Sequence, residues 1–488
     1  MPKYYFEVSS LREYLKHNTT LSGLQRVAHK VIFHAAQELG KDNVRLLYFD
    51  EFRGRHIVFS AIPLLYDEYL SIPELRSALL VSVDRIALFS NFPALERYSS
   101  NPLKYRFHLA RFILAERNSN KHFFLKRGTT LEEWRRHYKT SDSMTPANDK
   151  RLDYRSKEGL EERLEPNDVI CILNDNIFTR GANILLPQIA KKVGAKIYTM
   201  VHDLIPLVRV DESGCHPELF RDWLSSTAIN SAGLIANSQH TSEILRKYLE
   251  ANNFKTPIKL IPLAQSGLCD PSLTQPNEVV DELGTTLSSN ISKLTNEFSQ
   301  KNEVRTAAKL PFVLCVGNIE GRKNCWRIAQ AWAQLALLPN VELPRLVFAG
   351  KYGGLTRDFL KAYTATGGWG GWVLIVERPS DDELDFLYRR CAFTITASLY
   401  EGWGLTIGES LSYGKTAVVS DLTAMPEVGG DLVEYCDPYS IASIAASVKR
   451  LVEEPERKKE LEDRISRAKL RQWSDVGRDL ARVIGHNI

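Results

Sequence analysis

Two glutamates around a glycine-rich loop are the residues of this chain whose types and spacing best suit chemistry. Glu401 and Glu409 have seven residues between them, within the segment SLYEGWGLTIGESLSYGKTAVVSD at 398–421. Gly402 and Gly404 let the backbone approach a ligand closely. A helix that begins after them would present free N–H groups and a positive end to a phosphate. The segment therefore predicts an anion-binding loop with two carboxylates beside it.

Two adjacent cations, Arg322 and Lys323, follow an apolar run and a glycine. Such a pair can hold a diphosphate and stabilise charge on a departing phosphate. Cations at a helix start oppose the helix dipole, so a nearby anion explains their position better than solvation does. Structural alternatives stay open: a solvated basic pair, Glu409 as a first-turn acid of the helix, and Glu401 as a surface charge.

Several N-terminal positions could also face a ligand. His202 and Asp203 end one apolar run, and Ser238 ends another just before a helix pattern. Gly23 lies in a loop that opens a helix, where the absence of a side chain permits close approach to phosphate. Arg26 follows it and could reach an anion or lie on a solvated face. Asp203 and Ser238 could equally cap the turn or helix that follows them.

The elements that must position these residues form two strand-and-helix sets, which is typical of α/β domains. The first set has strands at 44–50, 168–175, 195–203 and 232–238, and helices at 22–40 and 182–194. The second set has strands at 311–318, 344–350, 371–377, 393–398 and 416–421. Together they predict an α/β protein with two Rossmann-like parallel-sheet domains. Such sheets bind ligands at the carboxyl ends of their strands, which is where the residues above lie.

We expect the following boundaries. An N-terminal domain covers 1–268, with a helical insertion at about 91–165, and a polar connector rich in Ser, Thr, Asn and Pro covers 269–308. A C-terminal domain covers 309–470, and a last helix at 471–488 packs back on the N-terminal domain.

Composition excludes several classes of protein. The 488 residues carry a formal charge of only +4, too balanced for a dedicated nucleic-acid binder. No apolar run approaches the length of a membrane span. The start, MPKYYFEVSS, lacks the plan of a signal peptide, and the seven cysteines never occur in C-x-x-C spacing. We expect a cytoplasmic protein without a disulfide framework or a zinc site.

One stretch departs from this charge balance. Residues 101–138 contain nine Lys/Arg and three Asp/Glu among apolar side chains. The stretch could meet anionic lipid or an acidic acceptor, which would make the protein peripheral on the inner face of the membrane. The alternative is an ordinary solvated helical insertion.

Seven segments, in order along the chain, resemble the motifs of glycosyltransferase family 4, which comprises retaining enzymes of the GT-B fold. The segment at 398–414 resembles the Glu-x7-Glu signature, with Trp403 where the family more often has Phe. The resemblance covers about 22–50 and 168–480, and not the insertion. The segments are SGLQRV (22–27), VHDLIPL (201–207), IANSQHTSEIL (235–245), VGNIEGRKN (316–324), RPSDDELDFLYRRC (378–391), SLYEGWGLTIGESLSYG (398–414) and MPEVGGDLVEYCDP (425–438).

The resemblance implies a nucleotide-sugar donor held mainly by the C-terminal domain, across a central cleft from an acceptor on the N-terminal domain. Arg322 and Lys323 would hold the diphosphate. Glu401 would hold donor sugar hydroxyls and Glu409 the two ribose hydroxyls. Further donor contacts are implied at Gly23, Arg378, Trp403, Gly404 and Leu405.

On the opposite side, the resemblance places His202 near the reacting carbon, through its ring or its backbone carbonyl. Asp203 and Ser238 would contact the acceptor. It also implies no cofactor and no metal. The segment LNDN (173–176) resembles an Asp-x-Asp metal motif, but its first position is Asn174. Both glutamates are accounted for by donor binding, so we expect front-face departure, in which the leaving phosphate accepts the acceptor's proton.

The segment HDLIPL looks like bacterial surface-polysaccharide mannosyltransferases. It favours a hexose, mannose from GDP-mannose, moved to a saccharide or lipid-linked glycan, over a UDP- or dTDP-sugar. Rival interpretations are a phosphorylase, a nucleotide-sugar epimerase and a non-catalytic sugar-nucleotide scaffold. Against a phosphorylase, the chain has no segment that matches the lysine that carries pyridoxal phosphate in glycogen phosphorylase-type enzymes. The Arg-Lys and EGWG segments favour transfer over epimerisation, and the scaffold predicts donor binding without turnover.

Overall fold

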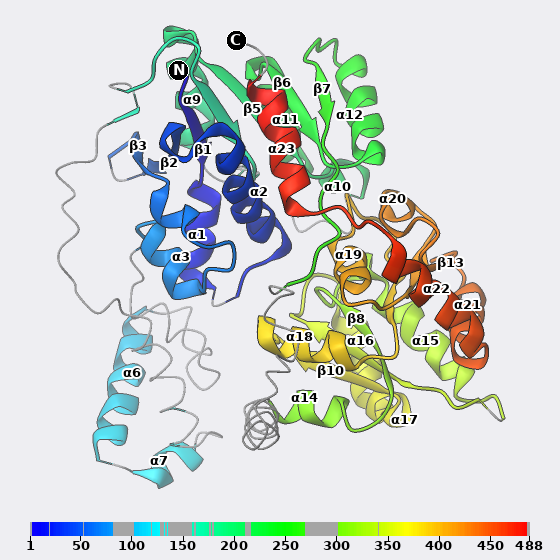
Figure 1. Ribbon diagram of the computed structural model, residues 1–488. Helices are drawn as coiled ribbons and strands as arrows, with labels where there is room; N and C mark the ends of the chain where they lie inside the picture. Colours follow the sequence, from blue (N-terminus) through cyan, green and yellow to red (C-terminus); the bar gives the residue numbers. More distant parts are fainter. Residues whose placement is uncertain are drawn as a thin grey trace, which may run out of the picture.

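The computed structural model shows two α/β domains, each built on a parallel sheet (Figure 1). The ranges that the structure describes are 2–18, 20–51, 53–81, 102–118, 120–126, 131, 134, 159–160, 163–174, 177, 180–209, 216–268, 301–339 and 341–485.

The N-terminal sheet has the strand order β3-β2-β1-β4-β5-β6-β7, and all neighbours are parallel except β2 and β3. Its strands are β1 Tyr4–Glu7, β2 Val44–Asp50, β3 Arg55–Ser60, β4 Val169–Ile172, β5 Lys196–Val201, β6 Gly233–Ala236 and β7 Ile258–Leu260. Its main helices are α1 Ser9–His17, α2 Gly23–Leu39, α3 Ile72–Ala78, α9 Arg180–Val193, α10 Ile205–Val208, α11 Pro217–Asn230 and α12 Gln239–Ala251. The predicted strands and helices are present, while β1, β3 and β7 were not predicted.

The C-terminal sheet has the order β10-β9-β8-β11-β12-β13 and is parallel throughout. Its strands are β8 Phe312–Val316, β9 Arg345–Gly350, β10 Val373–Glu377, β11 Thr394–Thr396, β12 Ala417–Ser420 and β13 Glu434–Cys436. Its helices are α14 Asn302–Ala307, α15 Cys325–Leu335, α16 Arg357–Ala365, α17 Gly367–Gly371, α18 Asp381–Arg390, α19 Leu405–Ser412, α20 Met425–Gly429, α21 Ile441–Glu453 and α22 Pro455–Arg467.

Both sheets share the doubly-wound strand order, in which the direction of winding reverses beside the first strand of each domain. In this fold the ligand binds outside the carboxyl ends of the strands at that point. The reversal lies between β1 and β4 in one sheet and between β8 and β11 in the other. The loops after these four strands are therefore where a site is expected.

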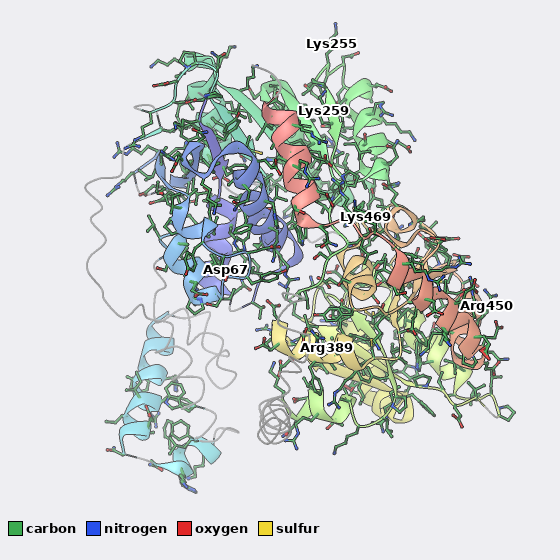
Figure 2. All side chains as sticks on the ribbon, viewed as in Figure 1. Asp67, Lys255, Lys259, Arg389, Arg450 and Lys469 are labelled. Carbon is green, nitrogen blue, oxygen red and sulfur yellow. The ribbon has the colours of Figure 1, made fainter. Side chains whose placement is uncertain are left out.

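The chain crosses between the domains twice, and the two crossings lie side by side. The Gln265 N–H donates to the Arg471 carbonyl at 2.8 Å, and the Arg471 side chain donates to the Pro262 carbonyl at 2.8 Å. The second crossing, marked by Lys469 in Figure 2, leads into α23, Trp473–Gly485. That helix lies against α2: a Cβ on Gly477 would come within 2.4 Å of His34 Cβ. Close packing of these two helices ties the C-terminus to the N-terminal domain.

One apolar cluster continues from the N-terminal domain into the C-terminal domain. It includes Val31 and Phe6 from the first, Trp403 and Ile407 from the second, and Trp473 from α23. The domains are therefore in apolar contact as well as linked by the chain.

Helices α6 Pro102–Arg117 and α7 Lys121–Leu125 lie in the predicted insertion, away from both sheets (Figure 1). They share a small apolar cluster, in which Phe112, Phe124 and Trp134 are buried. Most of the rest of 101–138 and most of the 269–308 connector lie outside the described residues, and the membrane contact stays a prediction. No helix in the described ranges is long and apolar enough to cross a membrane.

Candidate active site

The loops after β8 and β11 meet because these strands are neighbours. After β8 comes a short turn of 3-10 helix, Gly321–Lys323, and Asn324 follows in the left-handed conformation with φ 60°. The buried Asn324 amide donates to the Ala397 carbonyl at 3.0 Å and to the Pro438 carbonyl at 2.7 Å. These bonds fasten the turn to the loops after β11 and β13, which fixes where Arg322 and Lys323 point.

Arg322 and Lys323 both pair with Glu401. Lys323 Nζ lies 2.6 Å from Glu401 Oε1, and Arg322 lies 2.9 Å from Oε2. Arg322 also pairs with Glu320 at 2.8 Å and donates to the Tyr400 carbonyl at 2.7 Å. Burial by itself would raise the pKa of Glu401, but Arg322 and Lys323 lower it to about 2. The carboxylate is therefore ionised at any physiological pH, and the four side chains sum to zero formal charge.

Two helix starts lie against each other next to this cluster. Helix α19 begins after Gly404, which has φ 110°, and α2 begins at Gly23. Neither start has a capping side-chain acceptor for its N–H groups. A Cβ on Gly23 would come within 2.9 Å of Leu405 Cδ1, so the starts of the two helices lie close together. Two positive helix ends thus converge close to two cations, which suits an anion.

Glu409 lies buried on α19, and both of its oxygens are engaged. Tyr388 Oη donates to Oε2 at 2.7 Å, and Arg26 Nη1 donates to Oε1 at 3.1 Å. Burial raises the pKa of Glu409, although Arg26 and the Tyr388 hydroxyl oppose the shift. The Tyr388 ring stacks on Tyr413, with centroids 5.0 Å apart. The carboxylate is thus held in place from the C-terminal side and contacted by an arginine from the other domain.

On the N-terminal side, His202 presents its backbone. Its ring is buried, Nε2–H donates to the Leu173 carbonyl at 2.6 Å, and burial lowers its pKa to about 4. The ring is therefore neutral. Its carbonyl faces the C-terminal loop: a Cβ on Gly402 would lie 2.1 Å from that oxygen. Of the two options left open by the sequence, the carbonyl is the part of His202 that faces the other domain.

Asp203 and Ser238 both act as acceptors for backbone N–H groups. Asp203 Oδ1 accepts from Ile205 N–H at 2.9 Å, and burial raises the pKa of Asp203. Ser238 is buried, and its Oγ accepts from Thr241 N–H at 3.0 Å. This is the capping alternative for each of them. The Ser238 hydroxyl accepts this bond and can still donate one, so its contact with an acceptor stays a prediction.

The remaining predicted positions divide into contact and rim residues. Trp403 is buried between the domains, and its Nε1–H donates to the Ala264 carbonyl at 3.3 Å. Arg378, after β10, has a side chain 62% exposed and pairs with Glu377 at 3.5 Å. It lies on the rim, without a described contact to the Arg322 cluster.

Four contacts of the candidate site were not predicted from the sequence. The Glu427 carboxylate on α20 accepts from the Gln239 and His240 N–H groups at the start of α12, at 2.7 and 2.8 Å. The His240 ring lies 3.1 Å from Tyr400 Oη. The other two are the Asn324 bonds and the contact of Arg26 with Glu409. Each joins residues far apart in the chain, so no local signal reveals it.

Within the described ranges, no group of three or more His, Cys, Asp or Glu side chains is arranged to hold a metal ion. Asn174 is buried beside the Leu173 and Leu24 carbonyls. The two residues after it, at 175–176, lie outside the described residues.

Comparison with known proteins agrees with this geometry. Residues 296–470 match the family model "Glycosyl transferases group 1". The chain is 33% identical over 137 residues to O-antigen chain mannosyltransferase B of Escherichia coli, covering 28% of this chain and 35% of that protein. It is 22% identical over 259 residues to the serotype-specific mannosyltransferase WbdA of Escherichia coli, covering 52% and 29%. The chain thus spans about a third of the length of these curated relatives.

Among solved structures, Anabaena Alr3699/HepE in complex with UDP and glucose is similar at a TM-score of 0.55 and 14% identity, with all of both chains covered. At this identity the similarity concerns the fold. The predicted GT-B architecture, two parallel-sheet domains on either side of a central site, is confirmed.

Proposed function

We propose that this protein is a glycosyltransferase that moves a hexose from a nucleotide-sugar donor to a saccharide or lipid-linked glycan acceptor. One observation carries the proposal. Arg322, Lys323 and Glu401 form a partly buried ionic cluster at the reversal point of the C-terminal sheet, beside two uncapped helix starts. That arrangement suits a diphosphate joined to a polyhydroxylated ring. The family match over the same domain supports it.

The cluster suggests an exchange of partners when donor binds. A diphosphate would take over the contacts of Arg322 and Lys323, because charge-assisted bonds from a guanidinium and an ammonium to phosphate are strong. Glu401 would then be released to accept hydrogen bonds from sugar hydroxyls. Backbone N–H groups near Gly404 and Leu405 would contact the phosphates, and Gly23 would leave room for them. Arg378 would lie towards the base.

The proposed reaction is retaining and needs no metal. The bond between the anomeric carbon and the phosphate oxygen breaks, and the acceptor oxygen bonds to that carbon on the same face. The acceptor's proton passes to the leaving phosphate. Arg322 and Lys323 stabilise the charge that develops there. The His202 ring is a weak base, because burial lowers its pKa to about 4, and its Nε2–H is bonded to the Leu173 carbonyl. We therefore assign the proton to the leaving phosphate, while the His202 carbonyl lies on the acceptor side with Asp203.

The donor is proposed from the relatives' names. Two matched Escherichia coli proteins are mannosyltransferases, which favours mannose from GDP-mannose. The similar Anabaena structure holds UDP and glucose, so a UDP-sugar is the second candidate.

A thermal-shift and turnover screen tests the proposal. The full chain is heated with GDP, UDP, dTDP and their sugars, with and without EDTA. A ligand at about 100 times its Kd stabilises the folded state by about 2.7 kcal/mol, so one nucleotide series should raise the melting temperature. Flat curves for every nucleotide would contradict donor binding. If a donor binds but is neither transferred nor slowly hydrolysed, the scaffold interpretation is favoured instead.

A further inference from the structure

Arg26 joins the two domains at the nucleotide end of the site. It lies on the second turn of α2, with its side chain 12% exposed. Its Nη1 lies 3.1 Å from Glu409 Oε1, and its Nη2 lies 3.0 Å from Asp381 Oδ1 at the start of α18. One guanidinium therefore bridges two carboxylates of the opposite domain.

This contact conflicts with the role proposed for Glu409. Its Oε2 accepts from the Tyr388 hydroxyl at 2.7 Å, so Oε1 is the more open oxygen for a ribose hydroxyl. Arg26 lies against that oxygen. A ribose whose two hydroxyls bind Glu409 would compete with the guanidinium for the same carboxylate.

We propose that Arg26 is a self-inhibitory contact: it occupies the ribose position on Glu409 until a donor displaces it, and it then turns to the donor's diphosphate. The inference rests on the proposed function and adds regulation of the same site. A guanidinium suits both states, since its planar fork matches a carboxylate and a phosphate equally well. Asp381, more exposed than Glu409, anchors the arginine in the donor-free state.

The exchange also explains why a buried carboxylate is tolerated without ligand. An unpaired buried charge is strongly destabilising. Arg26 supplies the counter-charge when the site is empty, and the Tyr388 hydroxyl holds the other oxygen in both states. Arg26 lies on α2, three residues after Gly23, where the starts of α2 and α19 approach each other. The proposed phosphate position is therefore close to the helix that carries Arg26.

The test compares nucleoside with nucleoside diphosphate binding by calorimetry on the full chain. The probes are guanosine, uridine, GDP and UDP, with wild type, Arg26→Gln and Asp381→Asn. Arg26→Gln should bind the nucleoside about 5-fold or more tighter, in the range of typical coupling between sites. It should also gain less from the diphosphate than wild type does. Asp381→Asn removes the anchor of Arg26 but keeps the guanidinium. This variant should therefore bind both the nucleoside and the nucleoside diphosphate more tightly than wild type does.

Arg450→Gln is the matched control. Arg450 lies on α21 at the outer side of the C-terminal domain (Figure 2) and pairs with Glu434, whose side chain is 6% exposed, as Glu409's is 7% exposed. It should bind every probe as wild type does. Unchanged or weaker nucleoside binding in Arg26→Gln overturns the inference; if that variant does not fold, Asp381→Asn decides. No binding of any probe by any version would instead remove the proposed function itself.

Discussion

The two walls of the site differ in how their polar side chains are paired. On the C-terminal wall, Arg322 and Lys323 lie 2.9 and 2.6 Å from the Glu401 carboxylate, within one domain. On the N-terminal wall, the His202 ring is neutral and bonded to a backbone carbonyl, and Asp203 bonds to a backbone N–H. The first, the charged wall, is held by ion pairs, whereas the second is held by hydrogen bonds to backbone groups.

The substrates proposed above account for this difference. A nucleotide-sugar carries a diphosphate, and its binding depends on charge placed in advance. A glycan acceptor carries hydroxyls, which call for backbone and side-chain acceptors at fixed positions. We therefore expect substitutions on the first wall to change donor binding and turnover. We expect substitutions on the second wall to change how the two domains pack against each other.

The largest effect is expected for Glu401→Ala. Loss of the sugar contact should lower turnover about 100- to 1000-fold, the range seen when one preorganised transition-state contact is removed. Binding of the nucleoside diphosphate should be kept, because Arg322 and Lys323 remain. Calorimetry and initial rates measure both. Glu320→Ala is the control, because it removes the other carboxylate partner of Arg322, and it should lose less turnover. Loss of diphosphate binding in Glu401→Ala with intact turnover would contradict the proposed role of Glu401.

As the pH falls, the protein should lose the stability that depends on a neutral His202 before it loses the stability that depends on an ionised Glu401. The folded pKa of His202 is about 4, below its ordinary value near 6.5. Its stabilisation is therefore complete above pH 6.5 and is lost as pH falls from 6.5 to 4, by about 3 kcal/mol. Glu401, with a pKa of about 2, loses its contribution only between pH 4.5 and 2.

Urea unfolding midpoints across this range measure the effect. His202→Gln should show a shallower fall between pH 6.5 and 4 than wild type. His29 and His56, both buried with pKa values of about 4, remain as a common background in both proteins. Equal slopes would mean that His202 is not held neutral.

Gly402→Ala should separate the walls. The new Cβ would lie 2.1 Å from the His202 carbonyl oxygen, so the loop or the domain must shift. Overpacking of this kind costs about 1–3 kcal/mol, and here it would destabilise the contact between the two domains. X-ray scattering should show a larger radius of gyration, with lower turnover. Gly354→Ala, where nothing lies within 4 Å of the added Cβ, should behave as wild type.

The smallest effect is expected for Glu427→Gln. Its carboxylate accepts from two N–H groups at the start of α12, in the other domain. Loss of the charge should cost about 0.3–1 kcal/mol and loosen the domain contact. Glu456→Gln, which removes a first-turn acid within α22, should cost a similar amount without altering the scattering profile. An unchanged profile in both would limit Glu427 to local capping.

Sequence patterns predicted most of the framework and the charged wall. The strands of the C-terminal sheet are apolar runs that end in glycine or polar residues, and the predicted runs correspond to β8 to β12. The three-residue β7 and β13 contain the polar residues Lys259 and Glu434, so neither is an apolar run, whereas the equally short β11 lies within the apolar run at 393–398. The four-residue β1 was also not predicted. Tyr4–Glu7 nevertheless becomes an interior strand of its sheet, because β2 and β4 pair on either side of it.

Contacts between distant segments account for what the sequence did not predict. Arg26 and Glu409 are separated by 383 positions, and Gln239 and Glu427 by 188. Their meeting depends on how the two sheets pack, and no local pattern encodes that. Ser238 shows the opposite case: its local alternative, the helix cap, is the contact the structure contains.

The central claim is that the C-terminal wall binds a diphosphate through charge. The most direct measurement is the affinity of nucleoside and nucleoside diphosphate for Lys323→Met, with Lys351→Met, at the end of β9, as the control. Losing one partner of a buried charge pair costs about 2 kcal/mol or more, so the diphosphate should bind Lys323→Met about 30-fold or more weakly. The nucleoside should bind both variants as it binds wild type. Equal diphosphate affinity in wild type and Lys323→Met would contradict the account.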